Sequence, residues 1–352
     1  MAVTAGELLA DGAVRVRAGG RFGGMRVLFA SLASVGHTYP LVPLAVAARA
    51  AGHDVRWAAG EDVHAPLAAN GLRPFRPADS FYEIYAEDLA PELARWRPDL
   101  VVHEWGLPGA AVAAARAGVS GVWHGFGRMI PDGIGLELPT RNTEAPGRPH
   151  VDICPPSLQD KDFLVNEERI ALRPVAFSAP GARGDGPGPL VYLTLGTAFG
   201  TAELLTCAIE GVARLGVRVV VAAGRVRPEQ LGDLPDNVSV HSWVSQAELL
   251  PHADVVVHHG GSGTTLGALA AGAPQLVLPQ GADQFANADA VAASGAGLRL
   301  LPDELSADAV AEHVRALLAR HGGHRDAARA VAEEIAHMPS PAEVVRRLPD
   351  LA

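Results

Sequence analysis

Short apolar runs alternate with alanine-rich segments along most of this 352-residue chain, and this alternation limits the folds that it can adopt. The runs at 25–30 (MRVLFA) and 99–104 (DLVVHE) have the length and character of buried strands. The alanine-rich segments that follow them have the length of helices. Parallel strands need a crossover helix between them, so the sequence predicts an α/β protein built from doubly wound sheets.

The alternation comes in two series, which predicts two domains with a cleft between them. The glycine- and proline-rich segment 177–189 separates the series and is the predicted linker. We expect one domain over 25–176 and a second over 190–334. Residues 1–24 show weak periodicity and end in glycines, so we expect a flexible N-terminal extension there.

Composition argues against several classes of protein. The formal net charge of −10 disfavours non-specific nucleic-acid binding. Cys154 and Cys207 have neither the spacing of metal ligands nor the number of a disulfide framework. No apolar run reaches the roughly 18 residues that a membrane span needs, and the N-terminus lacks the apolar stretch of a signal peptide. We therefore expect a cytoplasmic protein with neither a nucleic-acid nor a membrane partner.

Three predicted strands of the second domain end in residues that suit a ligand. Gly196 and Thr197 follow the first strand, and Trp243 and Gln246 follow a middle strand. The stretch HHGGSGTT at 258–265 follows the next strand and opens a helix. Ligands of doubly wound sheets bind at the carboxyl ends of the strands, so we expect these groups to share one site.

The stretch 258–265 has two interpretations. Its glycines allow close backbone approach, and a helix N-terminus offers unpaired N–H groups and a positive dipole end. Together with the hydroxyls of Ser262 and Thr264, these features would hold a diphosphate without a metal ion. The alternative is structural: Ser262 or Thr264 is an N-cap, and the glycines form a tight turn.

The residues around this stretch favour the diphosphate. The segment resembles the nucleotide-sugar signature of the UDP-glycosyltransferase superfamily, and in particular its bacterial branch that modifies antibiotics and macrolides. That resemblance implies the GT-B architecture of two facing Rossmann-like domains. The residues that carry it, in the family's order and spacing over roughly 40 positions, are Trp243, Gln246, His252, His259, Gly261, Gly272, Pro274, Pro279, Asp283 and Gln284.

The resemblance implies which groups hold the diphosphate of the donor: the imidazole of His259 and the N–H groups of Gly261, Ser262, Gly263 and Thr264. Strand alternation points the neighbouring His258 to the opposite side, where we expect a structural role.

The resemblance also implies how the rest of the donor is held. Trp243 would stack on the pyrimidine, and main-chain groups near Val244 would read its edge. Asp283 and Gln284 would face hydroxyls of the donor sugar. The other candidates for the donor site are Gly196, Thr197 and Gln246.

Gly267 is a departure from the family's pattern. Superfamily members that use UDP-sugars typically carry a glutamate at this position, eight residues after the motif histidine, where it bonds the ribose hydroxyls. A donor without the 2′-hydroxyl has less use for that carboxylate. We therefore expect a dTDP-sugar as the co-substrate, which is the donor of the antibiotic-tailoring branch.

His37 is the candidate base. It follows the first strand of the first domain, and Glu104 ends a later strand, so both lie at carboxyl ends where they could meet. Histidine accepts a proton near neutral pH, and an acidic partner orients it and stabilises the charge it gains. The resemblance implies the same roles for His37 and for the acid at position 104, which is more often aspartate in the family.

Structural alternatives to these roles stay open. His37 could cap the helix that starts near Leu41, and Glu104 could be a solvated strand end. His103 competes as a partner for His37, although alternation points it away.

Further matches to the antibiotic-tailoring branch lie at 151–159, 173–177 and 337–345. The last implies that residues 335–352 form a C-terminal helix that returns to the first domain. Between 71 and 99 there is little room for the acceptor-binding elements that relatives often carry. This predicts a shallower or more open acceptor pocket, or one that a partner completes.

These observations together predict an inverting glycosyltransferase without a metal or other cofactor. It would move a sugar, expected to be a deoxysugar, from dTDP to a small hydrophobic natural product. One alternative is an enzyme like the lipid-acceptor N-acetylglucosaminyltransferase of cell-wall synthesis. Another is a non-catalytic auxiliary homologue. A homodimer or an auxiliary protein stays open as a partner.

Overall fold

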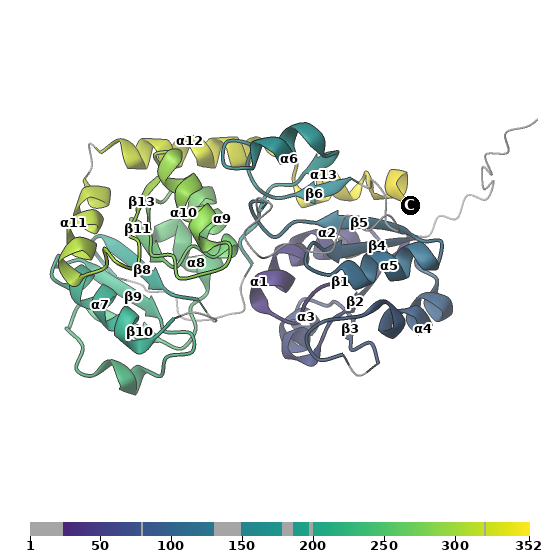
Figure 1. Cartoon of the computed structure of the whole chain (residues 1–352), viewed down its shortest axis with the longest axis horizontal. Coiled ribbons are helices and arrows are strands. Elements are labelled where there is room, and N and C mark those ends of the chain that lie inside the picture. The colour runs from purple at the N-terminus through teal and green to yellow at the C-terminus, as the bar shows by residue number, and fades with distance from the viewer. Residues whose placement is uncertain (1–23, 79, 130–148, 178–185, 197–199, 320–321) are drawn as a thin grey trace, which may run out of the picture.

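The computed structural model describes residues 24–352 except 79, 130–148, 178–185, 197–199 and 320–321. In this part of the chain two α/β units lie side by side (Figure 1). The predicted N-terminal extension, apart from Gly24, and most of the predicted linker fall outside the described residues.

The N-terminal unit is built on a parallel seven-stranded sheet of order β3-β2-β1-β4-β5-β6-β7. Its strands are β1 Arg26–Ala30, β2 Asp54–Ala58, β3 Pro74–Phe75, β4 Leu100–Glu104, β5 Ser120–His124, β6 His150–Asp152 and β7 Arg169–Ala171. Its helices are α1 Val35–Thr38, α2 Val42–Ala50, α3 His64–Ala69, α4 Ala86–Trp96, α5 Pro108–Arg116 and α6 Lys161–Asn166. One apolar core lies between the sheet and α2, and another lies between the sheet and the helices α4 and α5.

The C-terminal unit has a parallel six-stranded sheet of order β10-β9-β8-β11-β12-β13. Its strands are β8 Leu190–Thr194, β9 Arg218–Ala222, β10 Val238–His241, β11 Val255–His258, β12 Gln275–Val277 and β13 Gly297–Arg299. Its helices are α7 Ala202–Ala213, α8 Gln246–Leu249, α9 Ser262–Ala270, α10 Gln284–Ala293 and α11 Ala307–Leu318. The central strands are fully buried, which fits their continuous apolar sequence.

Both sheets reverse their strand order at a central pair of strands. The pair is β1 and β4 in the N-terminal unit, and β8 and β11 in the C-terminal unit. Loops diverge from the carboxyl ends of the strands at such a point and leave a crevice in which ligands bind.

The chain ends by returning to the N-terminal unit. Helix α12, Gly323–His337, runs along the top of the C-terminal unit in Figure 1 toward the N-terminal unit and leads to α13, Pro341–Val345. The hydroxyl of Ser340 and the carboxylate of Glu343 form a capping box at the start of α13. Val344 and Val345 belong to the same core as α2. The predicted fold class, two doubly wound units with a returning C-terminal helix, is confirmed.

His37 belongs to a short helix that follows the first strand. Residues Val35–Thr38 form this one-turn helix, α1, ahead of the helix that starts near Leu41. The backbone N–H of Thr38 donates to the carbonyl of Ser34 at 2.9 Å, and Tyr39 and Pro40 continue into a 3-10 turn. His37 therefore sits on ordered backbone.

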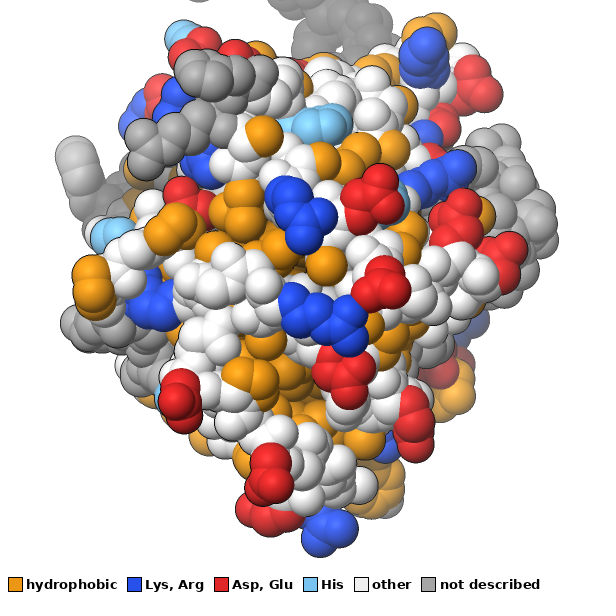
Figure 2. Space-filling view, turned by 90° about the vertical axis from the view of Figure 1, so that its left-hand side faces the viewer, with side chains coloured by type: hydrophobic (Ala, Val, Ile, Leu, Met, Phe, Trp, Pro, Cys, Tyr) orange, Lys and Arg blue, Asp and Glu red, His pale blue; other side chains and the backbone are white. Residues whose placement is uncertain are grey.

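The outer end of the C-terminal unit, which carries α7 and α11, has a mixed surface. Figure 2 shows Arg side chains beside Asp and Glu side chains there, with hydrophobic groups between them. Arg214, directly after α7, and Asp308 of α11 form one such pair at 2.6 Å. Within the described residues, no helix is long and apolar enough to cross a membrane.

Candidate active site

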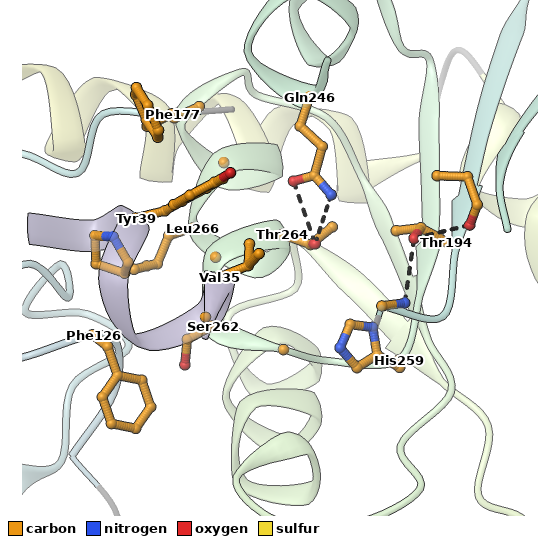
Figure 3. Close-up of a pocket in the computed structure, with 18 of the residues that line it drawn as sticks. Val35, Tyr39, Phe126, Phe177, Thr194, Gln246, His259, Ser262, Thr264 and Leu266 are labelled. Carbon is orange, nitrogen blue, oxygen red and sulfur yellow. Dashed lines mark hydrogen bonds between the residues drawn. The ribbon is translucent and has the colours of Figure 1, made fainter. Parts of the chain in front are cut away.

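A cavity of about 250 Å³ lies between the two units, where the two crevices face each other (Figure 3). The N-terminal unit lines it with α1 and the residues that follow β5 and β6, while segment 174–177 closes one side. The C-terminal unit lines it with residues at the ends of β8, β9 and β10 and with the first turns of α9.

On the N-terminal side His37 is paired with Glu104. Nδ1 of His37 lies 2.9 Å from Oε1 of Glu104, and the backbone N–H of Gly106 donates to the same oxygen at 2.6 Å. Glu104 is fully buried at the end of β4, whereas the side chain of His37 is 28% exposed. A carboxylate oxygen only accepts, so Nδ1 of His37 carries the hydrogen and Nε2 is the basic nitrogen.

The walls around His37 are apolar. The ring of Phe126 lies 4.8 Å from the ring of His37, and Tyr39 packs edge-on against Phe177 at the same distance. Figure 3 shows these aromatic side chains around α1. None of the three aromatic residues was expected at the site from the sequence. Phe126 lies two residues after β5, at the same sheet edge as β1 and β4, and that position was a usable signal. Phe177 ends the segment 173–177 that matches the antibiotic-tailoring branch, which was a second signal.

On the C-terminal side the N-terminus of α9 opens into the cavity. The N-cap, Gly261, makes no side-chain hydrogen bond, and Ser262 is the first residue of the helix. The N–H groups of Ser262, Gly263 and Thr264 therefore have no partner within the helix, and all three residues line the cavity. The alternative in which Ser262 or Thr264 caps the helix is not what the structure shows.

The hydroxyl of Ser262 belongs to a network around Asp283. It donates to Oδ2 of Asp283 at 2.9 Å, and Nδ2 of Asn287 lies 3.0 Å from the same oxygen and 3.1 Å from the Ser262 hydroxyl. Nδ2 of Asn287 also donates to the carbonyl of Gly260 at 2.8 Å. Asn287, which was not expected from the sequence, thus connects the glycine-rich turn to the carboxylate that lines the cavity.

The hydroxyl of Thr264 also forms a hydrogen bond within the protein. Nε2 of Gln246 donates to it at 3.2 Å (Figure 3). The same Nε2 donates to the hydroxyl of Tyr192 at 3.1 Å. Burial raises the pKa of Tyr192 to about 12, so this phenol stays protonated. The two hydroxyls expected to bind a phosphate therefore contact Asp283 and Gln246, which leaves the helix N–H groups as the donors that point into the cavity.

His259 lies between two glycines. A Cβ added at Gly196 or Gly261 would stand 2.5 Å from an atom of its ring, and Gly196 has a φ of +70°. Nδ1 of His259 is buried and has no hydrogen-bond partner among the described residues. Burial lowers the pKa of His259, against the charge of Asp283 and a backbone hydrogen bond with Thr194. The imidazole is therefore neutral at neutral pH.

His258 faces the other way. The N–H of Gly260 donates to its Nδ1 at 3.0 Å, so Nε2 carries the hydrogen and donates to Oε1 of Gln275 at 2.7 Å. It is fully buried, and burial lowers its pKa to about 3. This side chain holds the turn after β11 and does not line the cavity, in agreement with the structural role expected from strand alternation.

The structure brings most of the other expected donor residues to the cavity: Gly196, Trp243, Val244, Gln246 and Asp283 all line it. Gln284 does not. It is 2% exposed, and its Oε1 accepts from the backbone N–H of Gln280 at 2.8 Å, so it shapes the turn before α10. Thr197 lies outside the described residues.

Comparison with known proteins agrees with this geometry. Residues 206–351 match the sequence family described as erythromycin biosynthesis protein CIII-like, C-terminal domain. The chain is 33% identical to an L-demethylnoviosyl transferase of Streptomyces niveus and 34% identical to the elloramycin glycosyltransferase ElmGT of Streptomyces olivaceus. Each alignment covers 92% of this chain and 97% of the relative.

Solved structures give the same result. The glycosyltransferase SnogD from Streptomyces nogalater is 28% identical with a TM-score of 0.77. The Streptomyces sp. SF2575 glycosyltransferase SsfS6, complexed with thymidine diphosphate, is 26% identical with a TM-score of 0.75. Both alignments cover 93% of this chain and 99% of the other. The resemblance found in the sequence is confirmed, and the chain belongs to the GT-B glycosyltransferases of antibiotic biosynthesis.

Proposed function

We propose that the protein is an inverting, metal-independent glycosyltransferase that moves a deoxysugar from a dTDP-sugar to a small hydrophobic natural product. The observation that carries this proposal is one cavity with the His37–Glu104 pair on one side and the N-terminus of α9 on the other. A base and an anion site that face each other suit a single displacement, in which acceptor and diphosphate lie on opposite sides of the sugar.

The proposed step uses Nε2 of His37 as the general base. It takes the proton of an acceptor hydroxyl while that oxygen forms a bond to the anomeric carbon of the sugar. The bond between this carbon and the diphosphate oxygen breaks, and the electron pair leaves with the diphosphate. Glu104, fully buried and 2.9 Å from Nδ1, stabilises the positive charge that His37 gains. Attack and departure on opposite faces invert the anomeric configuration.

The diphosphate would bind to the first-turn N–H groups of α9 and to the neutral imidazole of His259. Charge grows on the diphosphate as the sugar leaves, and fixed N–H donors in a cavity stabilise such charge without rearrangement. In this proposal these groups stabilise the diphosphate charge in place of a metal ion. Asp283, whose Oδ2 is held by Ser262 and Asn287, would turn its other oxygen to a sugar hydroxyl.

Two observations support dTDP as the nucleotide. Gly267 lines the cavity without a side chain, and a Cβ there would lie 2.8 Å from Cδ1 of Leu250. The site thus lacks the carboxylate that UDP-sugar users carry at this position. The related SsfS6 was also solved with thymidine diphosphate bound. The acceptor would lie against the apolar wall of Val35, Phe126 and Ile153, which suits a hydrophobic molecule better than a polar one.

The test is a transfer assay with purified protein, paired dTDP- and UDP-sugars, and polyketide and aromatic acceptors, in the presence of a chelator. Mass spectrometry would detect the product, and proton NMR would give its anomeric configuration. We expect transfer from the dTDP-sugar with inversion and no loss of rate on chelation. Retention, a metal requirement or a preference for UDP would contradict the corresponding part of the proposal. Binding of thymidine diphosphate with no transfer to any acceptor would favour an auxiliary role.

A further inference from the structure

Two buried polar atoms beneath the active site have no hydrogen-bond partner among the described residues: Oε2 of Glu104 and Nε2 of His124. Glu104 uses its other oxygen for His37 and for the N–H of Gly106. Buried polar atoms are almost always bonded to protein or to ordered water, so two such atoms close together call for an explanation.

The sheet places these two side chains next to each other. Strands β4 and β5 are parallel neighbours, and their register pairs Glu104 with His124. Val102 and Val122, two residues earlier on each strand, both belong to the core under α2. The period of two puts Glu104 and His124 on that same face. His103 and Trp123 take the opposite face, where their rings lie 4.3 Å apart.

The hydrogen bonds of His124 determine its tautomer. Nδ1 lies 2.6 Å from the carbonyl oxygen of Gly125, which only accepts, so the hydrogen is on Nδ1. Nε2 therefore presents a lone pair. Burial also lowers the pKa of His124 to about 4, so the ring stays neutral at neutral pH. The titratable groups next to it on this face are Glu104 and, beyond Glu104, His37.

Two neighbouring acceptors need a donor with two hydrogens. A carboxylate oxygen and an unprotonated ring nitrogen cannot bond to each other, and a water molecule can donate one hydrogen to each. This bridge would hold the plane of the Glu104 carboxylate and keep Oε1 on Nδ1 of His37.

We propose that His124 is a positioning residue for the His37–Glu104 pair, acting through one water molecule that donates to Nε2 of His124 and to Oε2 of Glu104. The inference rests on the proposed function, in which His37 is the base. His124 does not touch the substrates. It controls how well Glu104 stabilises the protonated imidazole, and so affects both the rate and its pH dependence.

Two variants separate this role from packing. His124→Phe keeps a ring of similar size and removes both nitrogens. His124→Gln supplies an amide N–H that can donate to Oε2 of Glu104 directly. We expect His124→Phe to lower kcat about tenfold, the cost of leaving a buried acceptor unpaired. His124→Gln should recover most of that loss.

The decisive measurement is the pH dependence of kcat/KM. A carboxylate that is less well held stabilises the protonated His37 less, so a lower pH is needed to protonate the base. The acid limb of kcat/KM should move to lower pH by about half a unit in His124→Phe and return in His124→Gln. Affinity for thymidine diphosphate, which binds the other unit, should stay unchanged and also report that the variants fold.

His103→Phe is the matched control. His103 is equally buried, lies on the same sheet beside Glu104, and points to the opposite face. Its replacement should leave the acid limb where it is. A shift of the same size in His103→Phe would show that the effect is general packing and would overturn the inference.

A measurement on the unmodified enzyme gives an independent test. In ¹⁵N NMR spectra of histidine-labelled protein near pH 7, Nε2 of His124 should resonate as an unprotonated nitrogen that accepts a hydrogen bond. A protonated Nε2 would overturn the proposed bridge, even where His124→Phe fails to fold.

His37→Ala, measured in parallel, distinguishes the role of His37 as the base from the role of His124 in positioning Glu104. Activity retained in His37→Ala would overturn the base itself, and this inference with it. An inactive His37→Ala beside a His124→Phe with normal rate and normal acid limb would overturn this inference alone.

Discussion

The two units place a histidine at the same kind of crevice and surround it in opposite ways. His37 follows β1, is partly exposed, and has the carboxylate of Glu104 on Nδ1. His259 follows β11, is buried between Gly196 and Gly261, and stays neutral because burial lowers its pKa. In the proposed mechanism the first ring gains a proton, and the second meets an anion without gaining one.

The last residues of two equivalent strands show the same contrast. Strand β4 ends in Glu104, and β11, its counterpart in the C-terminal sheet, ends in His258. Both side chains are fully buried. The carboxylate of Glu104 contacts the imidazole of His37, whereas His258 bonds the N–H of Gly260 and the amide of Gln275. The two units thus share the crevice of the fold and differ in the residue that ends the strand, a carboxylate in one and an imidazole in the other.

The largest effect is expected from His37→Ala. Loss of a general base typically costs about a hundredfold to ten-thousandfold in kcat. Affinity for thymidine diphosphate should not change, because the donor groups belong to the other unit; titration calorimetry beside the transfer assay checks both. A His37→Ala variant that keeps more than a tenth of the rate would contradict the role of His37 as the base.

His259→Ala should change the affinity for thymidine diphosphate. A hydrogen bond to a charged group is worth about 1.5–3 kcal/mol, so we expect thymidine diphosphate to bind about tenfold to a hundredfold more weakly. The acid limb of the pH profile should stay in place, since the base is intact. A shifted limb with unchanged nucleotide affinity would mean that the roles of the two histidines are reversed.

Glu104→Gln and His258→Gln form a matched pair of strand-end variants. Glu104→Gln keeps the shape and removes the charge, so we expect a kcat about tenfold lower and an acid limb moved to lower pH. His258→Gln should leave the limb unchanged and lower the melting temperature instead. The pair of profiles, with melting curves by circular dichroism, shows whether the strand-end charge matters only in the N-terminal unit.

The sequence alone predicted the positions of the site residues that lie at strand ends. His37 and Glu104 were expected to meet because both lie at carboxyl ends of central strands, and strand alternation separated His258 from His259. The sequence did not reveal Asn287 or the direction of the Ser262 hydroxyl. Those depend on which neighbour 21 to 25 residues away comes within hydrogen-bond distance, and periodicity does not determine it. For the same reason Gln284 was expected at the donor sugar but bonds Gln280.

Acidification should weaken the two units unequally. In the N-terminal unit burial lowers the pKa of His103 to about 3, that of His124 to about 4, and that of His150. In the C-terminal unit burial lowers the pKa of His258 and of His259. The unfolded chain takes up these protons first, near the ordinary histidine pKa of about 6.5, so stability is full above that pH and falls below it. Each histidine contributes up to about 1.4 kcal/mol per pH unit.

The N-terminal unit holds more of these neutral histidines and should lose stability faster between pH 6.5 and pH 4.5. Hydrogen exchange with mass spectrometry, corrected for the intrinsic pH dependence of exchange, resolves the two units in one sample. We expect β4 and β5 to lose protection before β8 and β11. The reverse order would mean that other groups control the acid stability of the sheets.

The smallest effect is expected on the preference between UDP and thymidine diphosphate. Gly267→Glu restores the carboxylate that UDP-sugar users carry, and its Cβ would meet only the flexible end of Leu250 at 2.8 Å and Ala176 at 3.8 Å. One added hydrogen bond to the ribose 2′-hydroxyl is worth about 1 kcal/mol, so the ratio of UDP to thymidine diphosphate affinity should rise about fivefold. Gly267→Gln, with similar bulk and no charge, should raise the ratio less. If both variants bind thymidine diphosphate normally and neither changes the ratio, Gly267 does not face the ribose. The case for dTDP would then lose its main structural support, while the contrast between His37 and His259 would stand.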